Sequence, residues 1–176
     1  MDNSEEIVFK SPKQSSQQNI ENDIRLFRDT LGQFCTGVVA ITSIDNNGFK
    51  IGITVNSFSS LSLSPPLILW SLSEKSESFQ NFLYGDRFIV NILAREQETI
   101  ASKFSISGKN KFNGIETKLS ESKVPIINGC MAYLECEVYN RVTGGDHDII
   151  VGEVKKFSSN KKSPLIFFNG KYGSIN

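Results

Sequence analysis

The segment Gly52-Ile-Thr-Val-Asn-Ser-Phe-Ser-Ser-Leu-Ser-Leu-Ser-Pro-Pro66 is the stretch of this chain that says most about its fold. Its first residues include β-branched side chains typical of a strand, whereas the rest is rich in serine and ends in two prolines. We therefore expect a strand that runs into a polar loop before the next strand begins. The loop offers neutral hydroxyl and amide groups. Such groups suit a flat, polar-edged ligand that carries phosphate better than they suit a metal or a nucleic acid.

Short apolar runs on both sides of this segment predict further strands. The expected strands are 38–42, 49–55, 67–72, 87–93, 132–138, 149–157 and 165–168. Two tight turns are indicated by Asp45-Asn-Asn-Gly48 and by Asn169-Gly170, because asparagine and glycine tolerate positive φ. In the strand expected at 132–138, apolar and polar side chains alternate.

Helices are expected at three places between or before these strands. The first is capped by Asn22 or Asp23, the second is capped by Ser76, and the third covers 97–104. Their apolar faces consist of Ile24, Phe27, Leu31 and Phe34, then of Phe79, Phe82 and Leu83, and finally of Ile100, Ala101 and Phe104. The third helix is expected to turn its apolar face inward.

At least six strands with only short helices favour a mainly β, antiparallel barrel over βαβ units. No Gly-x-Gly-x-x-Gly motif follows a strand, so a Rossmann nucleotide site is not supported. Residues 1–21 are polar and are expected to form a mobile tail or an arm that lies on a partner. Residues 22–176 are expected to form one domain with a proper core.

The 176 residues carry 19 basic and 19 acidic side chains, so the formal net charge is zero. The main electrostatic attraction for nucleic acid is therefore missing, and we expect no nucleic-acid partner. The longest apolar run, 67–70, is too short to span a bilayer, and residues 1–20 lack the apolar stretch of a signal peptide. We expect a cytoplasmic protein without a membrane partner.

The three cysteines are Cys35, Cys130 and Cys136. Their odd number and the lack of Cys-x-x-Cys spacing argue against a disulfide framework and a structural zinc site. Core packing is expected for Cys35 and Cys136, because a free cysteine behaves as a small hydrophobic residue. A cysteine with the lone His147 would in principle form a nucleophilic pair, but the sequence around the cysteines gives no support for it.

Hydroxyl and amide side chains crowd residues 54–64. Either this is an ordinary polar loop, or its start lies near the core, where a ligand with many acceptors would satisfy otherwise unpaired hydroxyls. Residue types alone do not decide between these two interpretations. Ser71, Ser73 and Ser76 come at the end of the next strand. A helix N-terminus with spare hydroxyls would also seat a phosphate there.

Few charged residues stand out near these hydroxyls. Lys103 and Lys111 would add positive charge, although exposed lysines are mostly solvated surface. His147 is the sole histidine and follows Gly144-Gly-Asp146. A metal site would want further His or Cys ligands, so a functional His147 would act as a hydrogen-bond donor or a proton carrier near neutral pH. The glycine pair gives the backbone room to approach a ligand closely.

The order of short motifs along the chain is more specific than any single motif. The ordered set is Phe27-Arg-Asp-x-Leu-Gly-x-Phe34-x-Thr-Gly-Val38, Gly52-x-Thr-x-Asn-Ser-Phe-x-Ser-x-Ser62-x-x-Pro-Pro-Leu67, Phe88-x-Val-Asn-x-Leu93, Gln97 with Ala101-x-x-Phe104, Leu134-Glu-Cys-Glu-Val138 and Gly145-Asp-His-x-Ile-x-x-Gly-Glu-Val154, with Pro164-Leu165 and Tyr172 behind it. This set, over roughly 23–172, closely resembles the flavin reductase family that serves as the small component of two-component flavin-dependent monooxygenases.

The resemblance implies a split, Greek-key-like antiparallel β-barrel that binds FMN or FAD, usually as a homodimer with the flavin near the subunit interface. It also implies hydride transfer from NADH or NADPH to the flavin, which then leaves or passes to a separate oxygenase. The two cofactors carry the difficult chemistry. The protein has to stack the nicotinamide on the flavin with the reacting atoms about 3–3.5 Å apart.

The family's binding residues map onto this chain by position. The implied contacts are Thr54, Val55, Asn56 and Ser57 at the isoalloxazine edge, Ser60, Ser71, Ser73 and Ser76 at the ribityl chain and phosphate, and Phe104 and Lys111 along the rest of the flavin. Leu72, between two of these serines, belongs to the implied binding set. His147 would be the catalytic residue on the nicotinamide side, with Tyr172 nearby.

Two other functions stay open on the sequence alone. One is a flavoprotein of the same fold that holds FMN tightly and reduces another acceptor. The other is a flavin-binding store or sensor without enzymatic activity. The sequence also leaves open the choice between FMN and FAD, the choice between NADH and NADPH, and the identity of the oxygenase.

Overall fold

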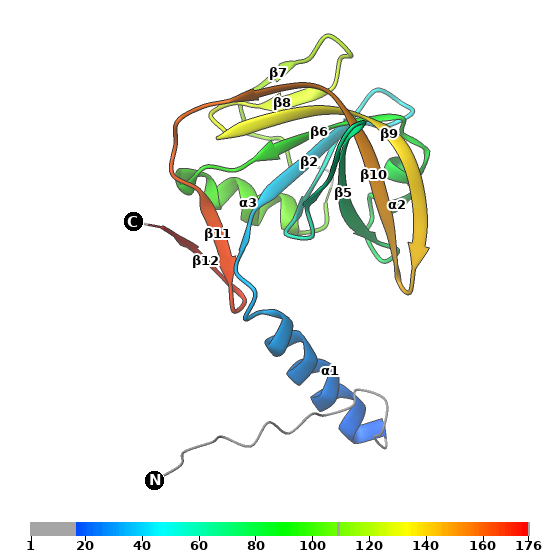
Figure 1. Cartoon of the computed structure of the whole chain (residues 1–176), viewed down its shortest axis with the longest axis vertical. Helices are drawn as coiled ribbons and strands as arrows, with labels where there is room; N and C mark the ends of the chain where they lie inside the picture. Colours follow the sequence, from blue (N-terminus) through cyan, green and yellow to red (C-terminus); the bar gives the residue numbers. More distant parts are fainter. Residues whose placement is uncertain (1–16, 109, 176) are drawn as a thin grey trace.

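A computed structural model describes residues 17–108 and 110–175 (Figure 1). Its largest part is a seven-stranded sheet with the strand order β3-β2-β6-β9-β10-β5-β4, in which all neighbours are antiparallel. A three-stranded sheet, β1-β11-β12, and a two-stranded sheet, β7-β8, complete the strands of the described part. The expected mainly β, antiparallel architecture is therefore confirmed.

The elements have the following bounds along the chain. The strands are β1 (Thr36–Gly37), β2 (Val39–Ile44), β3 (Lys50–Val55), β4 (Ser59–Leu63), β5 (Pro66–Ser73), β6 (Arg87–Ile92), β7 (Thr117–Leu119), β8 (Pro125–Ile127), β9 (Ala132–Gly144), β10 (His147–Ser159), β11 (Leu165–Phe168) and β12 (Lys171–Ser174). The helices are α1 (Gln17–Leu31), α2 (Phe79–Tyr84), the 3₁₀ helix η1 (Arg95–Gln97) and α3 (Glu98–Ser105). Within the described ranges, no helix has the length and apolar character needed to cross a membrane.

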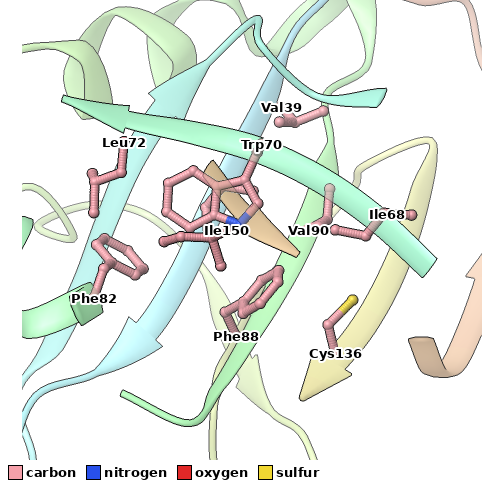
Figure 2. Packing of buried hydrophobic residues seen from close by; sticks show 10 residues of the cluster. Val39, Ile68, Trp70, Leu72, Phe82, Phe88, Val90, Cys136 and Ile150 are labelled. Carbon is pink, nitrogen blue, oxygen red and sulfur yellow. The ribbon is translucent and has the colours of Figure 1, made fainter. Parts of the chain in front are cut away.

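Strand β2 runs through two clusters of buried side chains, because successive residues of a strand point to opposite faces. One cluster contains Val39, Ile41, Ile68, Trp70, Leu72, Phe82, Phe88, Val90, Cys136 and Ile150 (Figure 2). The other contains Val38, Ala40, Leu93, Ala101, Phe104, Ile127, Cys130 and Leu165. Helix α3 contributes two of its residues to the second cluster, which confirms that its apolar face turns inward.

The predicted hairpin turn between β2 and β3 is present. The Asp45 carboxylate accepts hydrogen bonds from the backbone N–H groups of Asn47 and Phe49 at 2.9 and 2.8 Å. Gly48 has a φ of +82°, which glycine adopts at little cost. These local contacts explain why the turn was readable from sequence.

The serine-rich segment differs from the expected loop, because residues 59–63 form the edge strand β4. This strand pairs with β5, and Ser59 lies opposite Leu69. Serine and proline composition predicted a loop here, but pairing with a neighbouring strand overrides such weak local preferences. The short strands β7 and β8 were not predicted at all, since three residues each are too few to show a pattern.

Helix α1 begins at Gln17, ahead of the cap expected at Asn22 or Asp23. The expected polar tail therefore lies mostly outside the described residues. Figure 1 shows α1 standing away from the sheets. Its predicted apolar stripe does not pack against the barrel, since Phe27 is 52% exposed and Phe34, just after the helix, is 79% exposed.

The cysteines are all free, and their burial differs from what was expected in one case. Cys35 is exposed because it follows α1 away from the barrel, so its predicted core position was wrong. Cys130 and Cys136 are buried, and burial raises the pKa of Cys130 to about 11 and that of Cys136 to about 12. Both stay protonated at neutral pH, which argues against a nucleophilic role with His147.

Candidate functional site

Ser57 joins the serine-rich segment to the end of β5. Its hydroxyl accepts a hydrogen bond from the backbone N–H of Ser71 at 2.9 Å and donates one to the carbonyl of Ser71 at 3.2 Å. Because Ser59 lies opposite Leu69, this side chain continues the pairing of β4 with β5 beyond the end of β4. Two residues of the predicted binding set are thus held together.

The hairpin between β9 and β10 brings His147 beside the same end of β5. His147 lies opposite Ser73 in the antiparallel pairing of β10 with β5. The carbonyl of Asp146 accepts a hydrogen bond from the backbone N–H of Glu74 at 3.1 Å, which fixes the hairpin on the chain just after β5. Opposed residues, and residues two positions apart, share one face of a sheet. His147, Ser73 and Ser71 therefore lie on one face.

The imidazole of His147 is held by its neighbour in the chain. Its Nδ1 lies 2.7 Å from Oδ1 of Asp146, and the His147 side chain is 43% exposed. This hydrogen bond is the main cause that lowers the pKa of the Asp146 carboxyl. Within the described part of the chain, Asp146 is the ring's hydrogen-bond partner.

A second group of predicted residues lies between β3 and α3. The Thr54 hydroxyl donates a hydrogen bond to the carbonyl of Ala101 at 2.8 Å. The Lys111 ammonium donates to the carbonyls of Gly52 and Phe104 at 3.3 and 3.5 Å. A Cβ atom on Gly52 would lie 2.3 Å from the Phe104 ring, so only glycine lets the ring lie so close to the strand. Thr54, Phe104 and Lys111 are therefore brought together.

Both lysines considered for the phosphate site bind backbone carbonyls in this structure. Burial lowers the pKa of Lys111, and the nearby carboxylate of Glu77 opposes this effect. Glu77 also accepts a hydrogen bond from the backbone N–H of Gly108 at 2.9 Å. The Lys103 ammonium donates to the carbonyl of Asn113. A contact of Lys111 with the flavin stays a prediction.

Four further members of the predicted set divide between core and surface. Val55 packs against the cluster around Trp70, and Leu72 is a buried member of that cluster. Asn56 and Ser60 are exposed. Asn56 is adjacent to Ser57, whereas Val55 is half-buried and Leu72 is fully buried.

Ser73 and Ser76 are engaged by local backbone groups. The Ser73 hydroxyl accepts a hydrogen bond from the N–H of Lys75, and that of Ser76 accepts one from the N–H of Ser78, both at 3.3 Å. Ser76 is not the cap of α2, because Ser78 occupies that position without a side-chain hydrogen bond. A helix of six residues also gives little support to a phosphate seat at its N-terminus.

Tyr172 lies beside α3. Its ring meets the ring of Phe167 edge-on at 5.4 Å, and Ser102 and Ser105 of α3 lie close enough to its hydroxyl to lower the pKa of that group. Burial is the main cause that raises the pKa of the Tyr172 hydroxyl. Figure 1 shows β12 well away from the tip of the β9–β10 hairpin, so one chain does not bring Tyr172 next to His147.

The candidate site is an open surface within one chain. Three hollows of about 1010, 560 and 270 Å³ contain none of the predicted binding residues. The largest of them lies between the β2–β3 turn, the end of α2 and β7–β8. The predicted binding residues therefore lie outside these three hollows.

The predicted set of binding and catalytic residues did not include Gly52, Ala101 or Asp146. Ala101 meets Thr54 across 47 residues of sequence, and no local pattern predicts such a contact. The place of Gly52 against Phe104 is equally long-range. Asp146 did carry a signal, because a carboxylate directly before the lone histidine is a natural partner for its ring.

The fold is mainly β and antiparallel, and hydroxyl, amide and imidazole groups lie beside the end of β5. Among the described residues, no group of three or more histidine, cysteine or acidic side chains is placed to hold a metal ion. Residues 31–176 match the family described as Flavin reductase like domain. The chain belongs to the flavin reductase family and is an oxidoreductase. The family and the class of reaction expected from the sequence are thereby confirmed.

Named relatives and a solved structure agree with this assignment. The flavin-dependent monooxygenase reductase subunit HsaB of Mycobacterium tuberculosis is 39% identical over 156 residues, which are 87% of this chain and 83% of that protein. The FMN reductase (NADH) SmoA of Agrobacterium fabrum is 38% identical over 149 residues, 85% of this chain and 84% of its own length. The Streptomyces globisporus NADH:FAD oxidoreductase SgcE6, in complex with NAD and FAD fragments, has a TM-score of 0.83 and 31% identity, and the match covers 88% of this chain and 94% of SgcE6.

Proposed function

We propose that this chain transfers a hydride from NADH to FMN or FAD and gives the reduced flavin to a separate monooxygenase. The observation that carries the proposal is the face on which Ser57, Ser71 and Ser73 adjoin the His147 hairpin. Its neutral groups can bond a heterocycle edge and a phosphate without an opposite charge. Charge-assisted bonds are about twice as strong. Weaker neutral bonds suit a flavin that has to leave.

The contacts of Ser57, Asn56 and His147 suggest what each residue does when the ligands bind. Ser57 is fixed by Ser71, so the chain before it presents Asn56 in a defined place. The exposed Asn56 amide offers two donors and one acceptor, which match the mixed pattern of the pyrimidine edge of a flavin. The flavin, when bound, supplies the two-electron chemistry. His147 holds the nicotinamide carboxamide, while the barrel keeps both rings in place.

The names of two relatives support NADH as the hydride donor, because SmoA is named FMN reductase (NADH) and SgcE6 NADH:FAD oxidoreductase. The two names differ in the flavin. The proposal covers FMN and FAD alike, since the implied contacts concern the isoalloxazine, the ribityl chain and the first phosphate, which both flavins share.

A separate monooxygenase is the proposed consumer of the reduced flavin. HsaB is named as the reductase subunit of a flavin-dependent monooxygenase, and it aligns with 87% of this chain. The neutral binding face agrees with this role, because tight retention of the flavin would prevent its transfer. A mixture of this chain with its oxygenase should therefore hydroxylate substrate only when NADH and flavin are both supplied.

We also propose that the protein acts as a homodimer. The stripe of α1 leaves Ile24 47%, Phe27 52% and Leu31 59% exposed, and α1 stands away from its own barrel. Apolar surface of this kind is stabilised when a partner covers it. The binding face is open within one chain, and a second copy is the partner that would both cover the stripe and enclose the face.

The test of the function is steady-state oxidation of NADH and NADPH with FMN and with FAD in turn. We expect colourless protein that oxidises NADH only when free flavin is added. Protein that stays yellow on dialysis and reduces a different acceptor would favour the tight-binding flavoprotein. Yellow protein that is inert to NADH would favour a flavin store or sensor, and no spectral change with either flavin would refute the proposal.

The first prediction concerns His147. His147→Ala removes a hydrogen-bond partner of the nicotinamide, so kcat/KM for NADH should fall by about tenfold or more. Flavin affinity should stay within about twofold, because the residue faces the nicotinamide side. Stopped-flow flavin reduction and flavin titration measure the two quantities. Loss of flavin binding with unchanged hydride transfer would contradict the assignment.

The second prediction concerns Asn56. Asn56→Ala removes the amide proposed for the pyrimidine edge, so the flavin Kd should rise by about five- to thirtyfold. Asn46→Ala is the matched control, since Asn46 is an exposed amide in the β2–β3 turn. Fluorescence titration with FMN and FAD measures both variants. Equal affinity of the two variants would remove Asn56 from the site.

A further inference from the structure

We infer that Asp146 is a positioning residue that holds the imidazole of His147 in the tautomer with hydrogen on Nδ1 and a free lone pair on Nε2. Nδ1 of His147 lies 2.7 Å from Oδ1 of Asp146. An ionised carboxylate only accepts hydrogen bonds, so a neutral ring at this distance has to carry its hydrogen on Nδ1. The consequence for hydride transfer rests on the proposed function.

The backbone of the hairpin places the carboxylate. Gly145 has a φ of +72°, which forms the tight turn between β9 and β10. The carbonyl of Asp146 is bonded to the N–H of Glu74 at 3.1 Å, and His147 lies opposite Ser73. These contacts involve main-chain atoms and strand pairing. A change of the Asp146 side chain therefore leaves the hairpin in place.

The hydrogen bond from His147 and the charge of Lys75 favour an ionised Asp146, whereas the other charged groups nearby are acidic. On the segment after β5 the charged groups are Glu74 and Lys75, and on β10 the next residue is Asp148, which is 7% exposed. The end of β9 opposite His147 is Gly144 and carries no charge. The bond from His147 lowers the pKa of Asp146 most, and the charge of Lys75 adds to this effect.

The tautomer decides what the ring offers to a ligand. With hydrogen on Nδ1, Nε2 accepts a hydrogen bond, which matches the N–H of a carboxamide. The other tautomer would present an N–H and would match the carboxamide oxygen instead. An aspartate sets the tautomer of a histidine in the same way in the Ser-His-Asp triad. Asp146 thus fixes the orientation in which a carboxamide binds.

The direct test is the nitrogen NMR spectrum of the ring in the ligand-free protein. Because His147 is the sole histidine, labelling with ring-¹⁵N histidine gives one pair of signals. At about pH 9, above the usual titration range of imidazole, wild type should show hydrogen on Nδ1. Asp146→Ala should shift the ring toward hydrogen on Nε2. Glu74→Gln removes a charge nearby without touching the ring and should leave the tautomer unchanged.

The second arm measures catalysis in the same variants. Asp146→Ala should lower kcat/KM for NADH by about tenfold and keep the flavin Kd within about twofold. Glu74→Gln should keep both values. The role of Asp146 would be overturned if Asp146→Ala left the tautomer unchanged. It would also be overturned if Glu74→Gln lowered kcat/KM for NADH as much as Asp146→Ala does. If wild type oxidises no NADH, the proposed function and the catalytic consequence are both overturned. If wild type is active and Asp146→Ala behaves like wild type, only the role of Asp146 is overturned.

Discussion

Gly52 is the residue at which a single methyl group should matter most near the site. A Cβ atom there would lie 2.3 and 2.6 Å from two carbons of the Phe104 ring, and Phe104 is fully buried. The ring cannot swing away, because it also meets Phe112 edge-on at 4.8 Å. Gly52→Ala should therefore lower the free energy of unfolding by about 1–3 kcal/mol, measured by urea unfolding.

Gly37→Ala is the matched control for this prediction. A Cβ atom on Gly37 would meet nothing within 4 Å, and its φ is not in the left-handed region. Replacing a strand glycine by alanine reduces the entropy of the unfolded chain, so this variant should be unchanged or slightly more stable. Equal unfolding midpoints for the two variants would show that Phe104 does shift at little cost.

Asn91 on β6 ties three strands together, so its loss should act on whole elements. Its amide nitrogen donates to the carbonyl of Ala40 and to the hydroxyl of Thr42 on β2, both at 2.9 Å, and its oxygen accepts from the N–H of Ile127 on β8 at 2.9 Å. Asn91→Ala removes the side-chain acceptor of the buried Ile127 N–H, whereas the Thr42 hydroxyl keeps its hydrogen bond to the carbonyl of Pro125. The free energy of unfolding should fall by about 2–4 kcal/mol, whereas exposed Asn46→Ala should change it by less than about 0.5 kcal/mol.

Strands with repeated local signals were predictable from sequence. Asp45 and Gly48 predicted the turn of the β2–β3 hairpin, and the alternation of apolar and polar residues at 132–138 predicted β9. Strand β4 was missed because serine and proline favour loops, while its pairing with β5 depends on a partner strand. The start of α1 was missed because residues 17–21 lack apolar side chains with clear periodicity apart from Ile20. Turns and strands with local residue signals could be predicted from sequence, whereas the pairing of strands distant in sequence could not.

For the whole molecule, the order of motifs identified the family, but it did not predict which residues contact one another in the folded chain. Ser57, Ser71 and His147 were expected in one site, and strand pairing does bring them together. Tyr172 was expected near His147, and within one chain it lies beside Ser102 and Ser105 of α3. The predicted apolar stripe containing Phe27 faces solvent within one chain. Sequence shows which residues are apolar or reactive, whereas their partners depend on tertiary and subunit contacts.

The proposed homodimer gives the last prediction. Burying Phe27 in a partner should stabilise association by about 1.5–3 kcal/mol. Phe27→Glu should therefore raise the dimer dissociation constant by roughly tenfold to a hundredfold. Sedimentation over a range of concentrations should find wild type near twice the 19.6 kDa chain mass and the variant shifted toward one chain mass.

The control places the same charge on another face of α1. Asn22→Glu changes an exposed residue outside the apolar stripe, so the dimer should persist. Because α1 stands apart from the sheets (Figure 1), neither substitution should unfold them. Circular dichroism of both variants checks this expectation. Should the two variants dissociate equally, or wild type sediment as one chain at micromolar concentration, α1 would not be the subunit contact. The open binding face would then be completed by the flavin itself, or by the oxygenase that receives it.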